Sequence, residues 1–212
     1  MIKISHLETY GWHAAIRGMR NPLNSWKLSD TPADTPLIGE NDLNLMKSLV
    51  RGGSDHGKFM RQIGVAMDIT APFYWWKEFD TYKVGTVANS CSTMHTITKR
   101  EFTRDDFSTD HLLDESLDTL DITIAELNRW REKYLSVCRI TGKSNEAKSY
   151  WWQIIQLLPS SYNQKRTVTL NYAVLRNMYH ARKYHKLDEW RTFCRMIEED
   201  LMYSELITME QQ

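Results

Sequence analysis

The spacing of hydrophobic positions changes along the chain, and each spacing predicts a different kind of element. Weak alternation of apolar and polar residues over residues 2–12 predicts an N-terminal strand. Residues 64–72 also alternate and predict a second strand, which Pro72 ends because proline donates no ladder hydrogen bond. Residues 20–41 are rich in Pro, Asn, Ser and Asp and predict a loop.

Apolar residues recur with a helical period through much of the rest of the chain. The clearest case is residues 111–138, which predict one long amphipathic helix. Residues 40–53 predict a short helix that Asn41 or Asp42 caps and Gly52-Gly53 stops. Residues 165–172 fit both a strand and the start of a helix. Further helical segments are predicted over 54–62, from Pro72 through Lys83, from Thr103 as an N-cap, and over 144–158, 173–184 and 187–201.

The whole pattern predicts one domain of the α+β class. No internal repeat or low-complexity segment divides the sequence. The chain of 212 residues, 42% hydrophobic and 25% charged, has the composition of a soluble globular protein. We therefore expect a single helix-rich domain over residues 1–212 that contains a few strands.

Positive and negative side chains balance over the whole chain, and the formal net charge is zero. The chain therefore lacks the charge signature of proteins that bind nucleic acid polymers or anionic membranes. The charges are segregated, however: residues 101–126 hold nine acids and one base, and residues 163–195 hold eight Lys or Arg and two acids. The basic segment fits a site for a small anion, and equally a solvated helix face matched to an acidic neighbour.

Cysteine usage and hydropathy predict a cytoplasmic protein. Three cysteines lie far apart, at Cys91, Cys138 and Cys194, and form neither a disulfide framework nor a zinc pattern. The N-terminal residues lack the apolar stretch of a signal peptide, and no run reaches about 18 apolar residues. We expect no membrane span.

The sequence contains no glycine-rich phosphate loop, no nucleophile elbow and no zinc-protease motif. Its seven histidines are dispersed. His180 and His185 are five residues apart, a spacing that does not place them on one helix face. We therefore expect no metal site.

Residues 171–182 place polar groups on an apolar helical stripe. In a helix, Asn171 and Arg182 share one face with Leu175 and Met178. Buried polar groups without partners cost roughly 1–3 kcal/mol each, so both side chains need partners. An anionic, amide-rich ligand would satisfy them, and so would an Asp from elsewhere in the fold.

The stretch YWWKEFDTYKVGTVANSCSTMH, residues 74–95, combines aromatic rings, both signs of charge and a Ser-rich segment. Trp75 and Trp76 fit a well-filled aromatic core, and equally stacking on a ligand ring or packing against another subunit, because Trp buries a large area and keeps a polar group. A turn around Ser90 and Ser92 fits phosphate binding through hydroxyl and N–H groups, but the segment taken alone favours a simple Ser-rich connection.

Taken together, residues from about 53 to 193 resemble the flavin-dependent thymidylate synthases, through an order of motifs at matching spacing. His56 stands where the family has a histidine near the flavin, ahead of an alternating strand and Ala71-Pro72. Asn89, Ser92 and His95 stand at the Asn, second Ser and Tyr of the family's Ser-x-Asn-Glu-x-Ser-x-Arg-Tyr segment.

The resemblance continues in the C-terminal half of the chain. Leu158-Pro159 matches the family's Leu-Pro pair, and Asn171, Asn177 and Arg182 follow in the family's order. In the family the arginine at the last position contacts the pyrimidine. The segment HKLDEW, residues 185–190, continues like the family's closing helix.

The departures from the family pattern fall in its diagnostic signature and in the arginines that bind the nucleotide phosphate. The family's Arg-His-Arg is replaced by Thr81-Tyr82-Lys83 or by Tyr82-Lys83-Val84, depending on a one-residue gap. Ser90 replaces a Glu, Met94 replaces an arginine of the nucleotide phosphate site, and an apolar residue near Ile155 replaces a second such arginine. Lys is a poor substitute where Arg makes two parallel hydrogen bonds. The sequence therefore resembles a divergent branch, of bacterial or phage type.

The resemblance implies a fold, an assembly and an activity. The fold is that of the thymidylate-synthase-complementing proteins: α+β, with a small antiparallel sheet flanked by long helices, in a homotetramer with sites shared between subunits. FAD would be the cofactor, NADPH and methylenetetrahydrofolate the co-substrates, and methylation of dUMP to dTMP the simplest reaction. The alternatives are a catalytically lapsed homologue that binds a nucleotide or flavin, and a related enzyme that modifies another pyrimidine nucleotide.

The same resemblance assigns roles to residues. Arg182 would bind the pyrimidine and stabilise negative charge that develops on its ring. No nucleophilic role is assigned to Cys91. Contacts to the nucleotide are expected from Ser90, Ser92, Lys77, Glu78 and Arg182. Contacts to the flavin are expected from His56, Tyr82, Lys83, Asn89, Asn171 and Asn177, with Lys83 as the residual cation for its phosphates.

Overall fold

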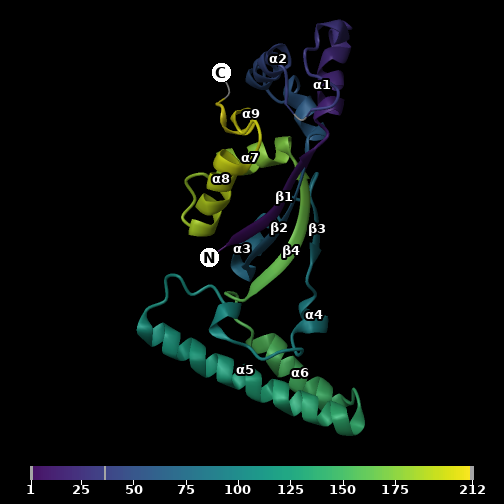
Figure 1. Cartoon of the computed structure of the whole chain (residues 1–212). Helices are drawn as coiled ribbons and strands as arrows, with labels where there is room; N and C mark the ends of the chain where they lie inside the picture. The colour runs from purple at the N-terminus through teal and green to yellow at the C-terminus, as the bar shows by residue number, and fades with distance from the viewer. Residues whose placement is uncertain (1, 36, 211–212) are drawn as a thin grey trace. The chain divides into compact units, whose positions relative to one another are not determined.

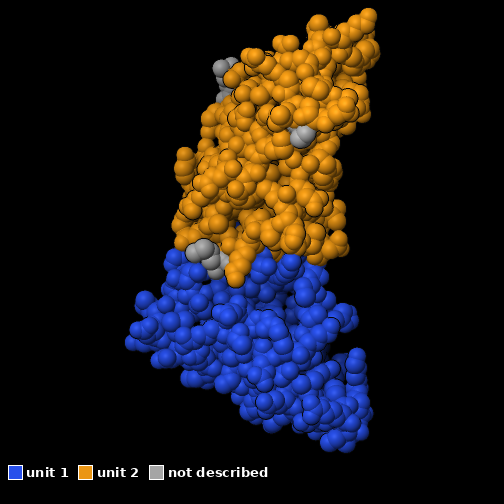
Figure 2. Space-filling view, in the orientation of Figure 1, with its two compact units in different colours: residues 1, 70–78, 90–166 blue, residues 2–69, 79–89, 167–212 orange. Residues whose placement is uncertain are grey.

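The computed structural model describes residues 2–35 and 37–210, and Figure 1 shows the arrangement of their helices and strands. These residues form two compact units, which Figure 2 colours separately. Unit 1 comprises residues 70–78 and 90–166, and unit 2 comprises residues 2–69, 79–89 and 167–210. Each unit therefore combines segments that are far apart in the sequence.

A four-stranded antiparallel sheet has the strand order β1-β2-β4-β3. Its strands are β1 (Lys3–Tyr10), β2 (Gly64–Pro72), β3 (Val87–Ser90) and β4 (Asn163–Asn171). β2 confirms the predicted alternation, because Val65, Met67 and Ile69 are buried and the residues between them are half-buried. The segment 165–172, whose pattern left strand and helix open, lies mostly in β4.

The turn predicted around Ser90 is only partly present. Asn89 and Ser90 belong to β3, an edge strand whose four residues are all exposed, and Cys91 and Ser92 connect it to α4 (Thr93–Thr96). The Cys91 N–H donates to the Lys165 carbonyl at 2.9 Å, so pairing with β4 extends past the end of β3. An exposed strand has no buried face to impose alternation, which is why the pattern suggested a turn.

Unit 1 is built mainly on a pair of long helices. α5 (Asp114–Thr141) and α6 (Asn145–Leu157) pack against each other, as Figure 1 shows. The 3₁₀ helix η4 (Arg104–Asp106) packs beside α5. Aromatic and aliphatic side chains from these elements form a buried cluster of Ile97, Phe102, Phe107, Leu120, Ile124, Leu127 and Ile154.

The helix ends in unit 1 follow the sequence signals. Ser144 caps α6, since its hydroxyl accepts from the Ala147 N–H at 3.2 Å, and the helix stops before Pro159. Thr103 and Asp106 form the predicted N-cap as a reciprocal capping box, although the helix that it starts is a single 3₁₀ turn. The long helix predicted over 111–138 is confirmed as α5.

Trp75 and Trp76 lie in the core of unit 1, which corrects the expectation that they stack on a ligand ring. Both are at most 1% exposed, and their rings meet edge to face with centroids 4.9 Å apart. The Trp76 indole N–H donates to the Gln164 carbonyl at 2.9 Å, and the Arg166 guanidinium lies 4.1 Å from the Trp76 ring centroid. Their contacts are therefore made within this chain.

Unit 2 carries the other helices around an aromatic core. Trp190 and Phe79 stack with centroids 6.4 Å apart, and Phe193 meets both rings edge to face. Tyr172, at the start of α7, is fully buried. The helical elements are α1 (Trp12–Arg20), η1 (Asn21–Leu23), η2 (Trp26–Leu28), α2 (Glu40–Arg51), η3 (Gly57–Gln62), α7 (Tyr172–Arg182), α8 (Asp188–Asp200) and α9 (Glu205–Thr208).

Helix α1 was not predicted, and its first residue was assigned to the N-terminal strand. Gly11 separates β1 from α1 with φ +89°, a left-handed conformation that favours glycine. A Cβ at Gly11 would lie 2.1 Å from the Gln62 carbonyl oxygen, so this close approach also requires glycine. The helix buries Trp12, Ala15, Ile16, Met19 and Arg20, which recur with a helical period.

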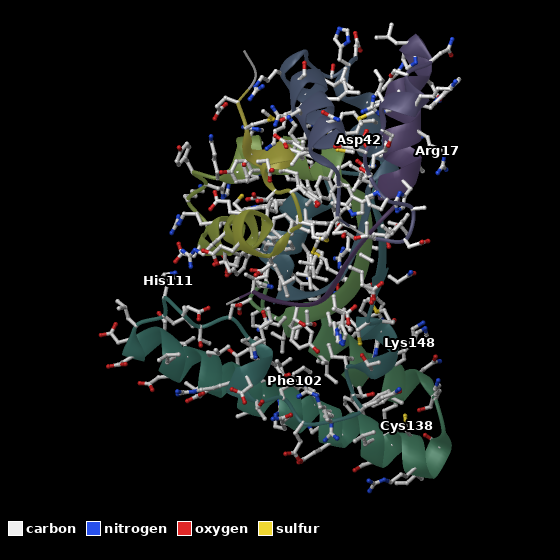
Figure 3. All side chains as sticks on the ribbon, turned by 45° about the horizontal axis from the view of Figure 1, so that its top comes forward. Arg17, Asp42, Phe102, His111, Cys138 and Lys148 are labelled. Atoms are coloured by element: carbon white, nitrogen blue, oxygen red, sulfur yellow. The ribbon has the colours of Figure 1, made fainter. Side chains whose placement is uncertain are left out.

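Helix α2 is confirmed, but neither Asn41 nor Asp42 caps it. The N-cap residue is Gly39, and the Asp30 carboxylate accepts from the N–H groups of Asn41 at 2.9 Å and Asp42 at 3.1 Å. Asp42, labelled in Figure 3, is fully buried and accepts from the Arg20 guanidinium at 2.6 Å. The capping carboxylate comes from a distant loop position that local patterns do not reveal.

The helix predicted from Pro72 to Lys83 is shorter than expected. It is α3 (Phe73–Phe79), and the Tyr82 N–H donates to the Phe79 carbonyl in the turn that follows. Within the described residues, none of the helices combines the length and apolarity that a membrane crossing requires. The described residues also contain no group of three His, Cys, Asp or Glu side chains placed to hold a metal ion.

Candidate functional site

Unit 2 contains a pocket of ≈ 700 Å³. Four segments line it: the end of α2 with the Gly-rich turn after it, η3, the loop at Val84-Gly85, and the first two turns of α7. Glu210 lies at its edge. A volume between about 300 and 1,000 Å³ is typical of sites for small molecules and cofactors.

Two helical faces carry the polar side chains of this pocket. On η3, Lys58 and Arg61 are three residues apart, and such positions eclipse each other in a 3₁₀ helix. On α7, Ala173, Asn177 and His180 recur at the i, i+4, i+7 spacing of one face, with Arg176 beside them. The two elements pack against each other, so both faces line the same pocket.

Asn171 and Gly85 lie close to each other in the wall of the pocket. Asn171 is the N-cap of α7, where its side-chain oxygen accepts from the Val174 N–H at 3.0 Å. Gly85 has φ +75°, and a Cβ there would lie 3.0 Å from Asn171 Nδ2 and 3.2 Å from Val174 Cγ2. Glycine thus lets the loop approach the start of α7.

The pocket has more positive than negative charge. Lys58, Arg61 and Arg176 face one carboxylate, Glu210, among the described residues that line it. Glu210 accepts from the Lys183 ammonium at 2.7 Å, and this hydrogen bond lowers the pKa of Glu210 and keeps it ionised. An anion is therefore the ligand that the pocket favours electrostatically.

Arg176 and His180 hold the C-terminal segment against α7. Arg176 Nη1 donates to the carbonyls of Leu206 at 3.3 Å and Ile207 at 2.9 Å. His180 Nε2 lies 3.1 Å from the Ile207 carbonyl oxygen. Burial, and then the positive charge of Arg176, lower the pKa of His180 below its ordinary value, which favours the neutral imidazole.

Arg182, the predicted catalytic residue, lies at the other end of α7. Its Nε donates to the Tyr82 hydroxyl at 2.9 Å. Its guanidinium carbon lies 4.9 Å from the Trp190 ring centroid and 5.6 Å from that of Tyr82, within cation–π range. The partners that the sequence required for these two side chains therefore include the Val174 N–H for Asn171 and the Tyr82 hydroxyl for Arg182.

Asn171 and Arg182 are eleven residues apart, so they are roughly 16 Å apart along the helix axis. Leu175 and Met178, on the stripe between them, are fully buried. The structure therefore brings Asn171 and Asn177 together in the pocket and does not place Arg182 among its lining residues.

The other residues predicted to contact flavin lie near the pocket or along β3. His56 is the exposed N-cap of η3, and its ring packs over Gly52. Tyr82 and Lys83 precede the pocket loop, where Lys83 is exposed and Tyr82 half-buried. Asn89 is exposed in β3.

The remaining residues predicted to contact the nucleotide belong to unit 1. Ser90 ends β3, and Ser92 is the N-cap of α4, where its carbonyl accepts from the Thr96 hydroxyl at 2.8 Å. Lys77 is exposed and Glu78 half-buried on α3. Cys91, between the two serines, lines a smaller pocket of ≈ 280 Å³.

The smaller pocket offers little free charge. Its Arg100 guanidinium pairs with the buried Asp106 carboxylate through two nitrogens, one at 2.8 Å from Oδ2. This hydrogen bonding raises the pKa of Arg100. Lys99 and Glu101 also line this pocket, so its positive and negative charges balance, and it is a weaker candidate for an anionic ligand than the pocket of unit 2.

Sequence patterns missed six polar side chains that line the larger pocket: Ser54, Lys58, Arg61, Arg176, His180 and Glu210. The available signal was the run GGSDHGKFMR, in which three glycines precede two cations at i, i+3 spacing. The second signal was a basic residue and a histidine at i, i+4 in the helix that follows β4.

Solved flavin-dependent enzymes share this architecture along nearly the whole chain. Thymidylate synthase X (ThyX) from Helicobacter pylori, solved with FAD and dUMP, matches with a TM-score of 0.68 at 14% identity, covering 99% of this chain and 98% of that one. A further structure of the Helicobacter pylori enzyme, also complexed with FAD and dUMP, gives a TM-score of 0.65 at 14% identity and covers 99% and 97%. The chain has the ThyX fold.

A third solved structure that is similar to this chain belongs to an enzyme with a different name. PolB from Streptomyces cacaoi, a UMP/dUMP methylase bound with 5-Br dUMP, matches with a TM-score of 0.57 at 13% identity, covering 93% of this chain and 88% of that one. No family model and no curated protein matches the sequence. The resemblance first seen in the order of motifs is therefore confirmed in the architecture, with a small antiparallel sheet and long helices.

Proposed function

We propose that this chain is a flavin-dependent enzyme that adds a one-carbon unit to a pyrimidine nucleotide, most simply in the methylation of dUMP to dTMP. The observation that carries the proposal is the ThyX fold over 99% of the chain, shared with an enzyme solved with FAD and dUMP. The pocket of unit 2, with its amides and excess positive charge, supports it.

The donor set of this pocket fits FAD. A flavin ring has an imide edge that pairs with amides, and the cofactor carries a diphosphate that needs cations. Asn171 and Asn177 supply amide groups, and Lys58 and Arg61 supply positive charge. Asn171 Oδ1 is engaged by the Val174 N–H, so its NH₂ group is the part directed to the loop at Gly85.

When bound, FAD supplies the redox and carbon-transfer chemistry, with NADPH and methylenetetrahydrofolate as co-substrates. The protein's own part is to orient the reactants and to stabilise charge. Arg182 would bind the pyrimidine and balance negative charge on its ring. Tyr82 and Trp190 hold the guanidinium in place before a ligand arrives, which lowers the cost of ordering it.

The contacts predicted from the other residues remain part of the proposal. His56, Tyr82, Lys83 and Asn89 would contact the flavin along with Asn171 and Asn177. Ser90, Ser92, Lys77 and Glu78 would contact the nucleotide. Lys77 and Ser90 are exposed, so their side chains are available to a ligand.

A second candidate is a related enzyme for another pyrimidine nucleotide. PolB, with the same fold, is a UMP/dUMP methylase, so the fold accommodates a ribonucleotide. A third candidate is a protein that binds a nucleotide or flavin without turnover. It is favoured by the engagement of Arg182 with Tyr82, at a position where the sequence departs from the Arg-His-Arg pattern.

The decisive experiment is the visible absorption spectrum of the purified protein before and after loading with FAD and desalting. A flavin band that survives desalting and changes on addition of dUMP supports the proposal. Turnover is then measured with NADPH and methylenetetrahydrofolate, using dUMP and UMP separately. A colourless protein that cannot be loaded with FAD would refute the flavoenzyme. A protein that binds FAD but turns over neither nucleotide would support the third candidate, a protein that binds a nucleotide or flavin without turnover.

The proposal also includes a cytoplasmic homotetramer of bacterial or phage type. Large apolar side chains are exposed on α5, including Ile122 at 71% and Ile140 at 82%. Such residues are typical of surfaces that become buried on association. Light scattering coupled to size exclusion tests the assembly, and a monomer at micromolar concentration would contradict it.

A further inference from the structure

Two cations of the larger pocket have no partner within the described residues. The side chains of Lys58 and Arg61 make no hydrogen bond or ion pair with any residue in 2–35 or 37–210, and both line the pocket. Most other basic side chains of unit 2 near α7 do have partners: Lys183 pairs with Glu210, and Arg191 pairs with Asp188 and the His185 carbonyl. Among the Lys and Arg residues that line the pocket, Lys58 and Arg61 are thus the two without such a partner in the described residues.

The helix that carries these cations fixes their direction. In a 3₁₀ helix, residues i and i+3 eclipse each other and lie about 6 Å apart along the axis. Phe59 and Met60, between Lys58 and Arg61, are both 3% exposed, and Met60 lines the pocket together with the two cations. Lys58 and Arg61 therefore lie on the same edge of η3, at the pocket that both residues line.

The other groups of the pocket cannot replace these two cations. Arg176 already donates to two carbonyls of the C-terminal segment. Burial and the neighbouring Arg176 favour the neutral form of His180, by lowering its pKa. Glu210 adds a negative charge. Arg176 keeps its charge, because carbonyl groups are neutral, but Lys58 and Arg61 are the pocket cations whose donors have no partner among the described residues.

We propose that Lys58 and Arg61 together bind the diphosphate of a nucleotide ligand at the η3 edge of this pocket. Naming that ligand as the dinucleotide FAD rests on the proposed function; the diphosphate site itself rests on the pocket. Two adjacent cations match the two adjacent phosphates of such a group, and Arg offers paired N–H donors. In this chain the diphosphate would then be held by η3 rather than by Lys83.

The test compares two double variants that lose the same charge. Lys58→Ala/Arg61→Ala removes the pocket cations. Arg17→Ala/Lys27→Ala removes two exposed cations of the same unit that lie outside the pocket and make no ion pair with a described residue. Arg17 is labelled on α1 in Figure 3. Affinities for FAD, ADP and riboflavin are measured by calorimetry, and thermal unfolding checks that both variants are folded.

The expected result is a loss of affinity that depends on phosphate. A hydrogen bond to a charged group contributes a factor of roughly ten or more in affinity. Lys58→Ala/Arg61→Ala should therefore bind FAD and ADP at least tenfold more weakly than the control variant, with riboflavin affinity unchanged. The charge-preserving exchange Lys58→Arg/Arg61→Lys should restore most of the affinity for ADP.

Equal affinities of the two double variants for FAD and ADP overturn the inference. An equal loss for riboflavin also overturns it, because the effect would then not depend on phosphate. If the wild-type protein binds ADP but neither riboflavin nor FAD, the proposed diphosphate site is supported and the proposal that the chain is a flavoenzyme is refuted. If the wild-type protein binds riboflavin and FAD equally well and does not bind ADP, the proposal that the chain is a flavoprotein is supported and the diphosphate site is refuted.

Discussion

The Arg182 Nε donates a 2.9 Å hydrogen bond to the hydroxyl of Tyr82, a residue one hundred positions earlier in the chain. The guanidinium also lies over the Trp190 ring. A long flexible side chain at a helix end is thereby held in one orientation by three contacts to two aromatic residues. This arrangement places an ordered, permanently charged group at the end of α7, where the proposed function needs one.

Arg182→Ala should abolish methylation of dUMP, because it removes the charge proposed to stabilise the pyrimidine ring. Tyr82→Phe keeps the ring and removes the acceptor of the Arg182 Nε. It should lower kcat about tenfold, with a small change in KM, if the hydrogen bond only orients the guanidinium. Steady-state kinetics on both variants, with FAD content measured by absorption, check this.

Unchanged kcat in Arg182→Ala would exclude the assigned role. Arg182→Lys is the matched variant, since it keeps the charge and loses the planar fork. Its kcat should fall between those of the wild type and Arg182→Ala.

Asp42→Ala should destabilise the protein by roughly 3–5 kcal/mol, since it leaves the buried Arg20 guanidinium without its partner. Arg20 and Asp42 are 4% and 0% exposed, and the Ser29 and Thr31 hydroxyls also donate to Asp42 Oδ2, at 2.7 and 2.6 Å. Denaturation in urea measures the free energy of unfolding.

The control is Asp121→Ala, which breaks the half-exposed ion pair with Arg104. That substitution should cost at most about 1 kcal/mol. If the two substitutions cost the same, burial does not set the strength of the Arg20–Asp42 pair.

The pair of Arg20 and Asp42 also leads us to expect that the free energy of unfolding falls at acidic pH. Burial would raise the pKa of Asp42, but hydrogen bonds from Thr31, Ser29 and Arg20 outweigh it and lower the pKa below 3.8. A lowered carboxylate pKa gives stability that is present above the unfolded value and is lost as the pH falls through the folded value. The wild type should thus lose more stability than Asp42→Asn between pH 5 and pH 2.

Gly85→Ala should destabilise the loop at the pocket wall. The residue has φ +75°, which costs a non-glycine residue roughly 1–2 kcal/mol, and its Cβ would press on Asn171 and Val174. Gly53→Ala is the matched control, because φ is +92° there but no atom lies within 4 Å of the added Cβ. Gly85→Ala should cost more free energy of unfolding than Gly53→Ala and should weaken FAD binding. Equal costs would mean that the close approach to Asn171 imposes no constraint.

The lowered pKa of His180 leads us to expect that the folded protein loses stability in mild acid. Its pKa is lowered below its ordinary value of 6.5 by burial and by Arg176, against the opposing charge of Glu210, with Lys183 as a further nearby cation. The unfolded chain therefore takes up this proton at a higher pH than the folded chain, and stability falls as the pH drops below about 6.5. Urea denaturation of wild type and His180→Gln at pH 7.5 and 5.5 measures the difference. A wild type that loses no more stability than His180→Gln would contradict it.

Glu210→Gln should strengthen the binding of ADP a few-fold, because it removes the carboxylate that lies at the pocket edge. Its exposed ion pair with Lys183 is worth little stability, so the fold should be unaffected. Glu199→Gln, which neutralises an exposed acid of α8 outside the pocket, is the control. The effect should shrink in 0.5 M salt, since screening weakens exposed charges. Equal ADP affinity in both variants would show that the charge of Glu210 does not affect ligand binding in this pocket.

Local chemistry explains the elements that the sequence predicted well. β2 alternates because one face of a central strand is buried, and α5 carries an apolar stripe that packs on α6. The elements that it missed have weak local signals. β3 is an edge strand with every residue exposed, and α1 begins immediately after a strand, at a glycine whose conformation only the fold requires.

The sequence by itself determined the helical and strand periodicities, the cap at Thr103, the apolar stripe of α7 and the order of motifs that resembles the flavin-dependent thymidylate synthases. Each of these depends on residues close together in the chain. Only the tertiary structure decided that Trp75 and Trp76 are core residues, that Tyr82 partners Arg182, and that the cations of η3 share a pocket with α7. Those relationships join residues that are a hundred or more positions apart in some cases, and only packing of the folded chain brings them together.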